Sequence, residues 1–273
     1  MLSLYSYNNS ICTQKVFIAL DEKRLAFDTR NVNLFANEQF RPEYLRINPN
    51  GVVPALDHDG AVVIESSLIC EYLDETFPEP RLSPATPHAR ARMRLWSKIV
   101  DEYLFEATRE LSFSAMFRER MKTMSAEQRE GRFRNVGDPV KRARLMSTYE
   151  DGVESPYVYE GIGWFEKAFA KMEQDLAAGG PWLVGADFTL ADINMIPFVA
   201  RLEYLGLLDV WIAERPLSRD WWRRARARPS FAVAIDGKVS DGERADMLKF
   251  GVAIKDRVAA RRADYLRQPK ATA

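Results

Sequence analysis

Glu65 and Ser66, at the start of a predicted helix, have the types and spacing of a receptor for a zwitterion. The stretch "SSLICEYLDETF" has helical periodicity, and Ser66 is a favourable N-cap for it. The first N–H groups of a helix have no partner within the helix, so they can bind a carboxylate. The carboxylate of Glu65 can then bind an ammonium group on the same ligand. The alternative is a plain N-cap beside a glutamate that faces solvent.

A proline interrupts the apolar stretch before this helix, in the segment "NPNGVVPAL". Proline lacks a backbone donor and is confined in sheets to edges, strand starts and bulges. Because Ala55 and Leu56 follow it, we expect a strand to start at Pro54. The backbone of Val53 is then left without a partner strand, and an extended ligand can pair with it.

The sequence provides little for histidine or metal chemistry. His58 and His88 are the two histidines, and both lie in polar, turn-like segments. Cys12 and Cys70 lack the paired spacing of a zinc site or a disulfide framework. We therefore expect no metal centre, no histidine-dependent mechanism and a reducing, cytoplasmic location. Cys70 falls on an apolar helix stripe and is interpreted as a core residue.

Composition excludes several classes of partner. The 273 residues contain 39 acidic and 39 basic side chains, so no net field recruits nucleic acid or an anionic membrane. The arginines of "WWRRARARP" are interpreted as a solvated helix face. The N-terminus lacks the pattern of a secretory signal, and no apolar stretch approaches the ~20 residues of a membrane helix.

The first part of the chain alternates short strands and helices. The predicted elements are a strand at 2–7, a helix at 13–24, a strand at 27–32, a hairpin at 54–65 that turns at Asp59-Gly60, and a helix at 66–77. The order is βαβ followed by ββα. It predicts a parallel strand pair with a right-handed crossover and an antiparallel addition.

The rest of the chain is predicted to be helical. After a proline-rich linker at 78–88, amphipathic helices are expected at 90–113, 159–180 and 218–228, and from 190 onward after a capping box of Thr189 and Asp192. Residues 125–158 have no clear period and are interpreted as a long excursion. A charged helix is expected after Gly242.

Four segments in this order resemble the soluble glutathione S-transferases: "SIC" at the first helix, "NPNGVVPAL", "ES" at 65–66, and "GADFTLAD" at 185–192. The resemblance implies an α/β thioredoxin-like domain at 1–80 and an all-α helical-bundle domain at 88–255. An excursion at about 120–160 and a charged tail at 256–273 complete the expected organisation. It also implies glutathione as cosubstrate, a cis bond at Pro54, and pairing of the Val53 backbone with the cysteinyl part of glutathione.

The resemblance assigns the zwitterion receptor to the γ-glutamyl end of glutathione, bound by Glu65 and Ser66. Ser10, between the first strand and the first helix, is the candidate donor to the thiolate. The alternative is that Ser10 only caps the helix, and Asn8, Asn9, Cys12 and Thr13 are the other candidates. Cys12 is interpreted as a structural thiol, with a redox nucleophile as the alternative.

The loop "FANEQFRPEYL" is expected to hold the glycyl carboxylate, with Gln39 and Arg41 as polar candidates. Relatives place a basic residue or histidine where Phe40 stands, which leaves this contact open. The stretches "INPNGVVPALDHDGAVVIESSLICEYLDETFPE", "MRLWSKIVDEYL" and "FTLADIN", together with the excursion after residue 120, most resemble the bacterial β-etherases, which cleave β-aryl ethers of lignin-derived aromatics. Candidates for contact with a small aromatic substrate are Tyr7, Trp96, Tyr103, Phe113, Met116, Phe117, Tyr157, Tyr159 and Trp164, most of them expected to be core.

Two other functions stay open: a glutathione-dependent reductase or isomerase, in which Cys12 would matter, and a non-enzymatic binding module. A module that only associates has no need for Glu65 and Ser66 as a zwitterion receptor. The resemblance also implies a homodimer.

Overall fold

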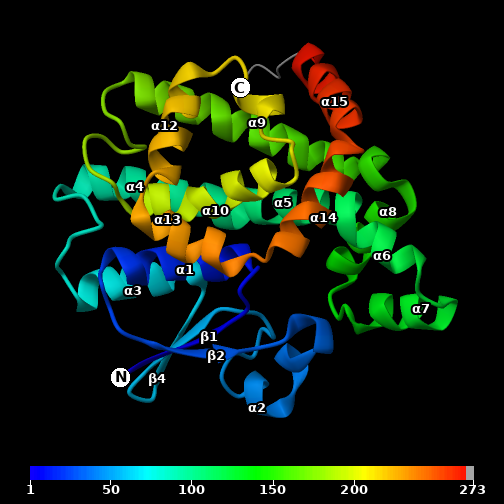
Figure 1. Cartoon of the computed structure of the whole chain (residues 1–273), viewed down its shortest axis with the longest axis horizontal. Helices are drawn as coiled ribbons and strands as arrows, with labels where there is room; N and C mark the ends of the chain where they lie inside the picture. The colour runs from blue at the N-terminus through cyan, green and yellow to red at the C-terminus, as the bar shows by residue number, and fades with distance from the viewer. Residues whose placement is uncertain (269–273) are drawn as a thin grey trace. The chain divides into compact units, whose positions relative to one another are not determined.

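A four-stranded mixed sheet forms the start of the chain in the computed structural model, which describes residues 1–268 (Figure 1). Strand β1 (Leu2–Ser6) pairs in parallel with β2 (Asp28–Asn31) and antiparallel with β3 (Ala55–His58), which pairs with β4 (Ala61–Ile64). The resulting order is β2-β1-β3-β4. The β3–β4 turn places Asp59 at φ 53° and Gly60 at φ 89°, a left-handed backbone that glycine adopts at no steric cost. The predicted βαβ-ββα order is confirmed.

Helices α1 (Ile11–Glu22) and α3 (Ser66–Thr76) lie together on one face of this sheet (Figure 1). Leu2 and Leu4 of β1 face them and are buried, as their alternation predicted. Most of α1 is buried, which explains why its sequence shows only a weak polar face.

The other face of the sheet is covered by the segment between β2 and β3. This segment contains the short helices η1 (Leu34–Ala36), η2 (Glu38–Phe40) and α2 (Pro42–Leu45). Its core is a cluster of Val32, Tyr44 and Val53, against which Tyr5 of β1 packs. Pairing of Tyr5 with Tyr44 follows from the alternation of β1, because Tyr5 points away from α1.

One long helix follows the proline-rich linker, but it is not a regular α-helix. It consists of α4 (Pro87–Ile99), the π-helical η3 (Val100–Leu104), α5 (Phe105–Ser112), the π-helical η4 (Phe113–Phe117) and α6 (Arg118–Lys122). The amphipathic helix predicted at 90–113 is present and extends further. The two π-helical segments had no sequence signal.

The remaining elements between Ala126 and Arg267 are helices. They are α7 (Ala126–Asn135), α8 (Pro139–Asp151), η5 (Gly152–Glu154), α9 (Pro156–Ala177), α10 (Leu190–Tyr204), α11 (Asp209–Ile212), α12 (Pro216–Arg226), α13 (Pro229–Ala234), η6 (Asp236–Lys238), α14 (Asp241–Val252) and α15 (Lys255–Arg267). Within residues 87–268, strand-like pairing is limited to an isolated bridge between Trp182 and Gly185. The predicted fold class is therefore confirmed. The predicted tail at 256–273 extends past the described residues.

The described chain forms two compact units, and neither is continuous in sequence. One contains residues 1–98, 175–200 and 220–240, and so combines the sheet with most of α10 and with α13. The other contains 99–174, 201–219 and the chain from 241 onward.

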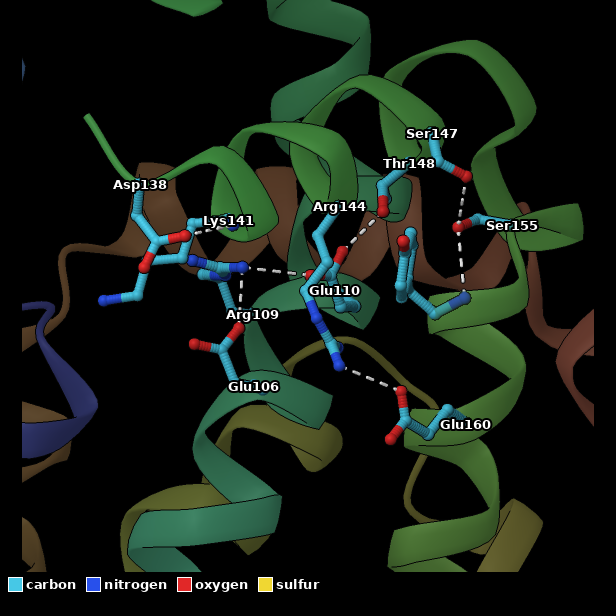
Figure 2. A network of polar contacts seen from close by, with 11 residues as sticks. Glu106, Arg109, Glu110, Asp138, Lys141, Arg144, Ser147, Thr148, Ser155 and Glu160 are labelled. Atoms are coloured by element: carbon cyan, nitrogen blue, oxygen red, sulfur yellow. Dashed lines mark hydrogen bonds and ion pairs between the residues drawn. The ribbon is translucent and has the colours of Figure 1, made fainter. Parts of the chain in front are cut away.

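The excursion is more ordered than its sequence indicates, because α7 and α8 fill most of it. Side chains cap both helices: Ser125 and Gln128 form a capping box on α7, and Asp138 accepts from two N–H groups of α8. Figure 2 shows how α8 is fixed to its neighbours. Thr148 donates to the buried carboxylate of Glu110 on α5, and Arg144 pairs with Glu160 on α9 at 3.1 Å.

The capping box before α10 is confirmed and has an additional partner. The Thr189 N–H donates to the Asp192 carboxylate at 3.0 Å, and Thr189 Oγ1 accepts from the Ala191 N–H at 3.3 Å. Asp192 also accepts from the Leu183 N–H and the Trp221 indole, so its buried carboxylate joins a loop and α12 to the start of α10. Burial raises the pKa of Asp192 to about 6, although these hydrogen bonds act to lower it.

Candidate functional site

Ser10 is the N-cap of α1, and its Oγ accepts a hydrogen bond from the Thr13 N–H at 3.3 Å. The cap uses the oxygen as acceptor, so it leaves the hydroxyl hydrogen available for donation to a ligand. Ser10 is half-buried at the positive end of the α1 dipole. This position lets one hydroxyl cap the helix and also donate to an anion.

The other candidates around Ser10 differ in exposure. Asn8 is exposed and its carbonyl accepts from the Gln14 side chain at 3.3 Å, while Thr13 is fully buried. Cys12 is half-buried in the first turn of α1, and Cys70 is fully buried in α3, as expected for a core thiol.

The Val53–Pro54 peptide bond is cis, as the resemblance implied, and β3 begins directly after it. The neighbouring Val52 carbonyl accepts from the Tyr44 hydroxyl at 2.6 Å and from Asn48 at 2.8 Å. Within residues 1–268, no hydrogen bond involves the N–H or C=O of Val53. Both groups are therefore available to pair with an extended peptide.

Helix α3 occupies the predicted segment, but its N-cap lies one residue earlier than the sequence predicted. Glu65, not Ser66, is the N-cap residue, and Ser66 is the first helical residue. The backbone of Glu65 (φ 69°, ψ 114°) is in a region that residues other than glycine rarely adopt, and such outliers concentrate at ligand sites. Glu65 accepts from Asn50 Nδ2 at 3.2 Å and makes no side-chain cap. The first N–H groups of α3 are thus left for another acceptor.

Gln39 lies in η2 and is 9% exposed. Its amide oxygen is buried and has no hydrogen-bond partner among the described residues. Arg41, the other candidate, is exposed and paired with Glu38 at 3.2 Å, and the ring of Phe40 is half-exposed. Arg41 is thus already engaged by Glu38, whereas the Gln39 amide has unused hydrogen-bonding capacity, which favours Gln39 over Arg41.

The aromatic candidates separate into core and accessible residues. Trp96 is fully buried and donates to Asp175 at 2.9 Å, and Met116 is also buried. Tyr103 stacks on Trp164, with ring centroids 3.8 Å apart and planes 15° apart. The half-buried members are Tyr7, Tyr103, Phe113, Phe117, Tyr157, Tyr159 and Trp164.

Two kinds of feature are absent from the described residues. They contain no group of histidine, cysteine, aspartate and glutamate side chains that could hold a metal ion. No helix within residues 1–268 has the length and apolar character needed to span a bilayer.

A four-stranded β2-β1-β3-β4 sheet with a cis-proline before β3, followed by a helical region, defines the class of thioredoxin-like proteins with a helical C-terminal part. Residues 4–81 match the family model described as glutathione S-transferase, N-terminal domain, and residues 159–224 match that of the C-terminal domain. The chain is 33% identical over 254 residues to Protein LigF of Sphingobium sp., covering 91% of this chain and 96% of that protein. The chain belongs to the glutathione S-transferase family.

Solved structures and other relatives agree. The crystal structure of β-etherase LigF from Sphingobium sp. strain SYK-6 matches with a TM-score of 0.75 and 31% identity, over 86% of this chain and 99% of that one. Tetrachloro-p-hydroquinone reductive dehalogenase of Sphingobium chlorophenolicum is 28% identical, covering 85% of this chain and 95% of that protein. Maleylacetoacetate isomerase of Pseudomonas aeruginosa is 30% identical, with the same coverage. The expected enzyme class, a glutathione transferase with glutathione as cosubstrate, is thus supported.

Proposed function

We propose that this enzyme uses the glutathione thiolate to attack an aromatic electrophile, and that its reaction is cleavage of a β-aryl ether. The main support for a glutathione site is that the Val53 backbone makes no hydrogen bond among the described residues and that the N–H groups at the start of α3 have no side-chain cap. Support for the aromatic substrate comes from two relatives, a β-etherase and a dehalogenase of a chlorinated hydroquinone.

Each part of glutathione has a complementary group on the chain. The Val53 N–H and C=O pair with the cysteinyl backbone, and Pro54 fixes the start of β3 beside it. Ser66 and the following N–H groups hold the γ-glutamyl carboxylate, and Glu65 binds the ammonium. Gln39 takes the glycyl carboxylate. The orphaned Gln39 amide oxygen and the strained Glu65 backbone fit a site built for a polar ligand.

Ser10 activates glutathione by donating a hydrogen bond that stabilises the thiolate form of its sulfur. A free thiol has a pKa of roughly 8.5, and lowering it by two units requires about 2.7 kcal/mol of preferential thiolate binding. One donated hydrogen bond to a charged acceptor contributes roughly 1.5–3 kcal/mol. The positive end of α1 adds to it. The Ser10 hydroxyl at the N-cap is therefore of the right strength to keep the thiol ionised near neutral pH.

The reaction itself is a displacement. The sulfur attacks the carbon that bears the phenoxy group, a C–S bond forms, and the C–O bond breaks with its electron pair on the leaving phenolate. The protein holds the thiolate against the electrophile in an apolar slot. We expect two or three of the half-buried aromatic residues to contact the substrate.

A reductase or isomerase is the second candidate. The relatives named reductive dehalogenase and maleylacetoacetate isomerase favour it, and Cys12 is half-buried within the first turn of α1. In that case Cys12→Ser would abolish thiol transfer and Ser10→Ala would not.

Retention on immobilised glutathione, followed by two assays, tests the proposal. We expect release of a phenol from a β-aryl ether substrate at a rate that depends on glutathione. Conjugation of a generic aryl halide without ether cleavage would remove only the β-etherase assignment. Failure to bind glutathione at all would refute both catalytic proposals.

We also propose a cytoplasmic homodimer with the domain boundaries given above. Cys12 and Cys70 form no disulfide with each other, which is compatible with a reducing compartment. Exposed apolar side chains on β4, α3 and α4, namely Val62, Leu68 and Leu95, support a dimer contact.

A further inference from the structure

Phe35 lies in a short turn, η1, whose backbone is fixed by several hydrogen bonds. Asn33 is the N-cap of this turn, and its Oδ1 accepts from the N–H groups of Phe35 at 3.0 Å and Ala36 at 3.1 Å. The Asn33 N–H donates to Glu38 Oε2 at 2.8 Å, and Asn37 ends the turn in a left-handed conformation with φ 55°. The turn chemistry of this segment therefore determines where Phe35 is placed.

The two apolar residues that begin this turn differ in exposure. Leu34 packs against the cluster of Val32, Tyr44 and Val53, and this contact joins η1 to the sheet. Phe35, the next residue, is 50% exposed. A single exposed apolar side chain is ordinary on a protein surface and by itself indicates no function. What distinguishes Phe35 is the contact that its ring makes.

The ring of Phe35 lies against the ring of Tyr7, edge to face, with centroids 5.9 Å apart and planes at 73°. Aromatic pairs favour this geometry. Tyr7 is half-buried, and its carbonyl accepts from the Ser10 N–H at 2.9 Å, which closes the tight turn between β1 and α1. Tyr7 therefore connects the exposed ring of Phe35 to the turn that carries Ser10, the residue whose hydroxyl donates to the thiolate in the proposed function.

We propose that Phe35 is a specificity-determining residue that receives the aryl group of the electrophile. An aryl group attached to the glutathione sulfur, which Ser10 holds, contacts the exposed part of the Phe35 ring, while Phe35 keeps its contact with Tyr7. Contact between aromatic rings contributes more than the burial of their area alone, so this position favours an aryl group over an alkyl group of similar size. This inference rests on the proposed function and adds a residue outside the candidates that the sequence indicated.

Phe35→Leu tests the inference, because leucine keeps an apolar side chain and removes the ring. Calorimetry measures the affinities for S-benzylglutathione and S-hexylglutathione, whose groups on sulfur are comparable in size and differ in aromaticity. We expect the variant to bind S-benzylglutathione about fivefold more weakly, as for the loss of one aromatic pair, and to bind S-hexylglutathione as the wild type does. Phe35→Tyr keeps the ring and should keep the wild-type affinity for both conjugates.

Phe40→Leu is the matched control, since Phe40 is 51% exposed and lies on the same segment between β2 and β3. Its ring lies over Gly51 instead, where an added Cβ atom would be 2.9 Å from Phe40 Cε1. We therefore expect Phe40→Leu to leave the ratio of the two conjugate affinities unchanged. Because both conjugates contain the same tripeptide, an effect of either variant on the binding of glutathione itself cancels in this ratio.

Two results would overturn this inference. One is an unchanged ratio of the two affinities in Phe35→Leu, whether both conjugates bind as before or both bind more weakly. The other is an equal fall of the ratio in Phe40→Leu, which would make the effect common to the segment rather than a property of Phe35. Neither result affects the proposed function, which fails if the wild-type protein does not bind glutathione.

Discussion

The Ser10 hydroxyl accepts and donates through different atoms, so capping and activation are compatible in one residue. Its oxygen receives the Thr13 N–H, and its hydrogen is left to be donated. Val53 and Glu65 contribute to the candidate site through their backbones. Val53 keeps both polar groups outside the sheet ladders, and Glu65 holds an unfavourable conformation that opens the start of α3. The candidate site therefore contains groups whose hydrogen-bonding capacity the fold uses only in part.

Ser10→Ala should separate activation from binding. We expect kcat to fall about ten- to a hundredfold, the loss of one hydrogen bond to a charged acceptor, with the KM for glutathione nearly unchanged. The loss of the cap should also lower the unfolding free energy by about 1 kcal/mol. Steady-state kinetics and denaturant unfolding measure the two effects.

Two further variants separate capping from donation. Ser10→Asp keeps a cap acceptor but has no hydrogen to donate, so it should retain stability and lose kcat. Ser10→Thr should retain both. An equal loss of kcat and of glutathione affinity in Ser10→Ala would mean that the hydroxyl acts in docking.

Glu65 should show a conflict between stability and binding. Glu65→Gly removes the strain of a positive φ, which costs roughly 1–3 kcal/mol for other residues, but also the carboxylate. We expect the melting temperature to be retained or raised while glutathione affinity falls at least about tenfold, as for a lost charged partner. Calorimetry and thermal unfolding provide the two readouts.

Glu65→Gln is the matched variant for the charge alone. Its amide oxygen can still accept from Asn50, so the backbone conformation is kept and only the interaction with the ammonium is weakened. Unchanged glutathione affinity in Glu65→Gln would show that the Glu65 charge takes no part in binding.

Among the helices and strands, the sequence predicted correctly those features that depend on residues close together in the chain. The alternation of β1, the Asp59-Gly60 turn and the capping box of Thr189 and Asp192 each depend on residues that are neighbours in sequence, and each was predicted correctly. The N-cap of α3 was assigned to Ser66, one residue too late, because Ser66 is a good N-cap by type. The backbone of Glu65 at φ 69° takes the cap position instead, and residue type does not reveal it.

Elements that depend on tertiary contacts were less predictable. Helices α7 and α8 are held by caps and by polar contacts such as Glu110 with Thr148, and none of residues 126–134 of α7 is buried, so the hydrophobic period is weak. The π-helical segments η3 and η4 depend on backbone hydrogen bonding that residue types do not reveal, so they were not predicted. The bond between Lys15 and Ser67 joins residues distant in sequence and had no signal.

Asp192 should give the helical region a distinct pH dependence. Its folded pKa of about 6 lies above its ordinary value of 3.8, so the native state holds more protons than the unfolded state between these values. The unfolding free energy therefore falls as pH rises through this window, by up to about 1.4 kcal/mol per pH unit for one proton. Asp192→Asn should be less stable than the wild type throughout, because its amide NH₂ cannot accept, and should lack this fall.

Urea unfolding between pH 4 and pH 7 measures the difference in slope between variant and wild type. Asp138, an exposed N-cap whose pKa is lowered by hydrogen bonds from Lys141 and Val140, is a control of opposite sign. Its contribution is present above its ordinary pKa and is lost as pH falls, so Asp138→Asn should flatten the acid side. Identical slopes for Asp192→Asn and wild type would contradict the raised pKa.

At the scale of the whole molecule, the sheet depends on residues from the far end of the chain. Helix α13 packs against α1, and Glu22 of α1 accepts from Arg228 at 2.7 and 2.6 Å (Figure 1). Arg228 belongs to the arginine-rich stretch that the sequence indicated to be a solvated face, and this pairing corrects that interpretation for it. The compact unit that contains the sheet therefore includes residues 220–240 as well as the first eighty residues.

Dimerisation is the prediction that concerns the molecule as a whole. Leu95 on α4 is 45% exposed, and the pairing of Arg94 with Glu71 at 3.0 Å places this part of α4 beside α3, where Leu68 is 57% exposed. Burying such apolar side chains between two copies is favourable, and a charge there is costly to bury. We expect Leu95→Glu to convert a dimer into a monomer in sedimentation velocity, with glutathione affinity retained because Leu95 lies outside the candidate site.

Val140→Glu, which alters an even more exposed apolar residue on α8, is the matched control and should remain dimeric. A wild-type protein that sediments as a monomer would refute the homodimer, and a dimer that survives Leu95→Glu would place its interface elsewhere.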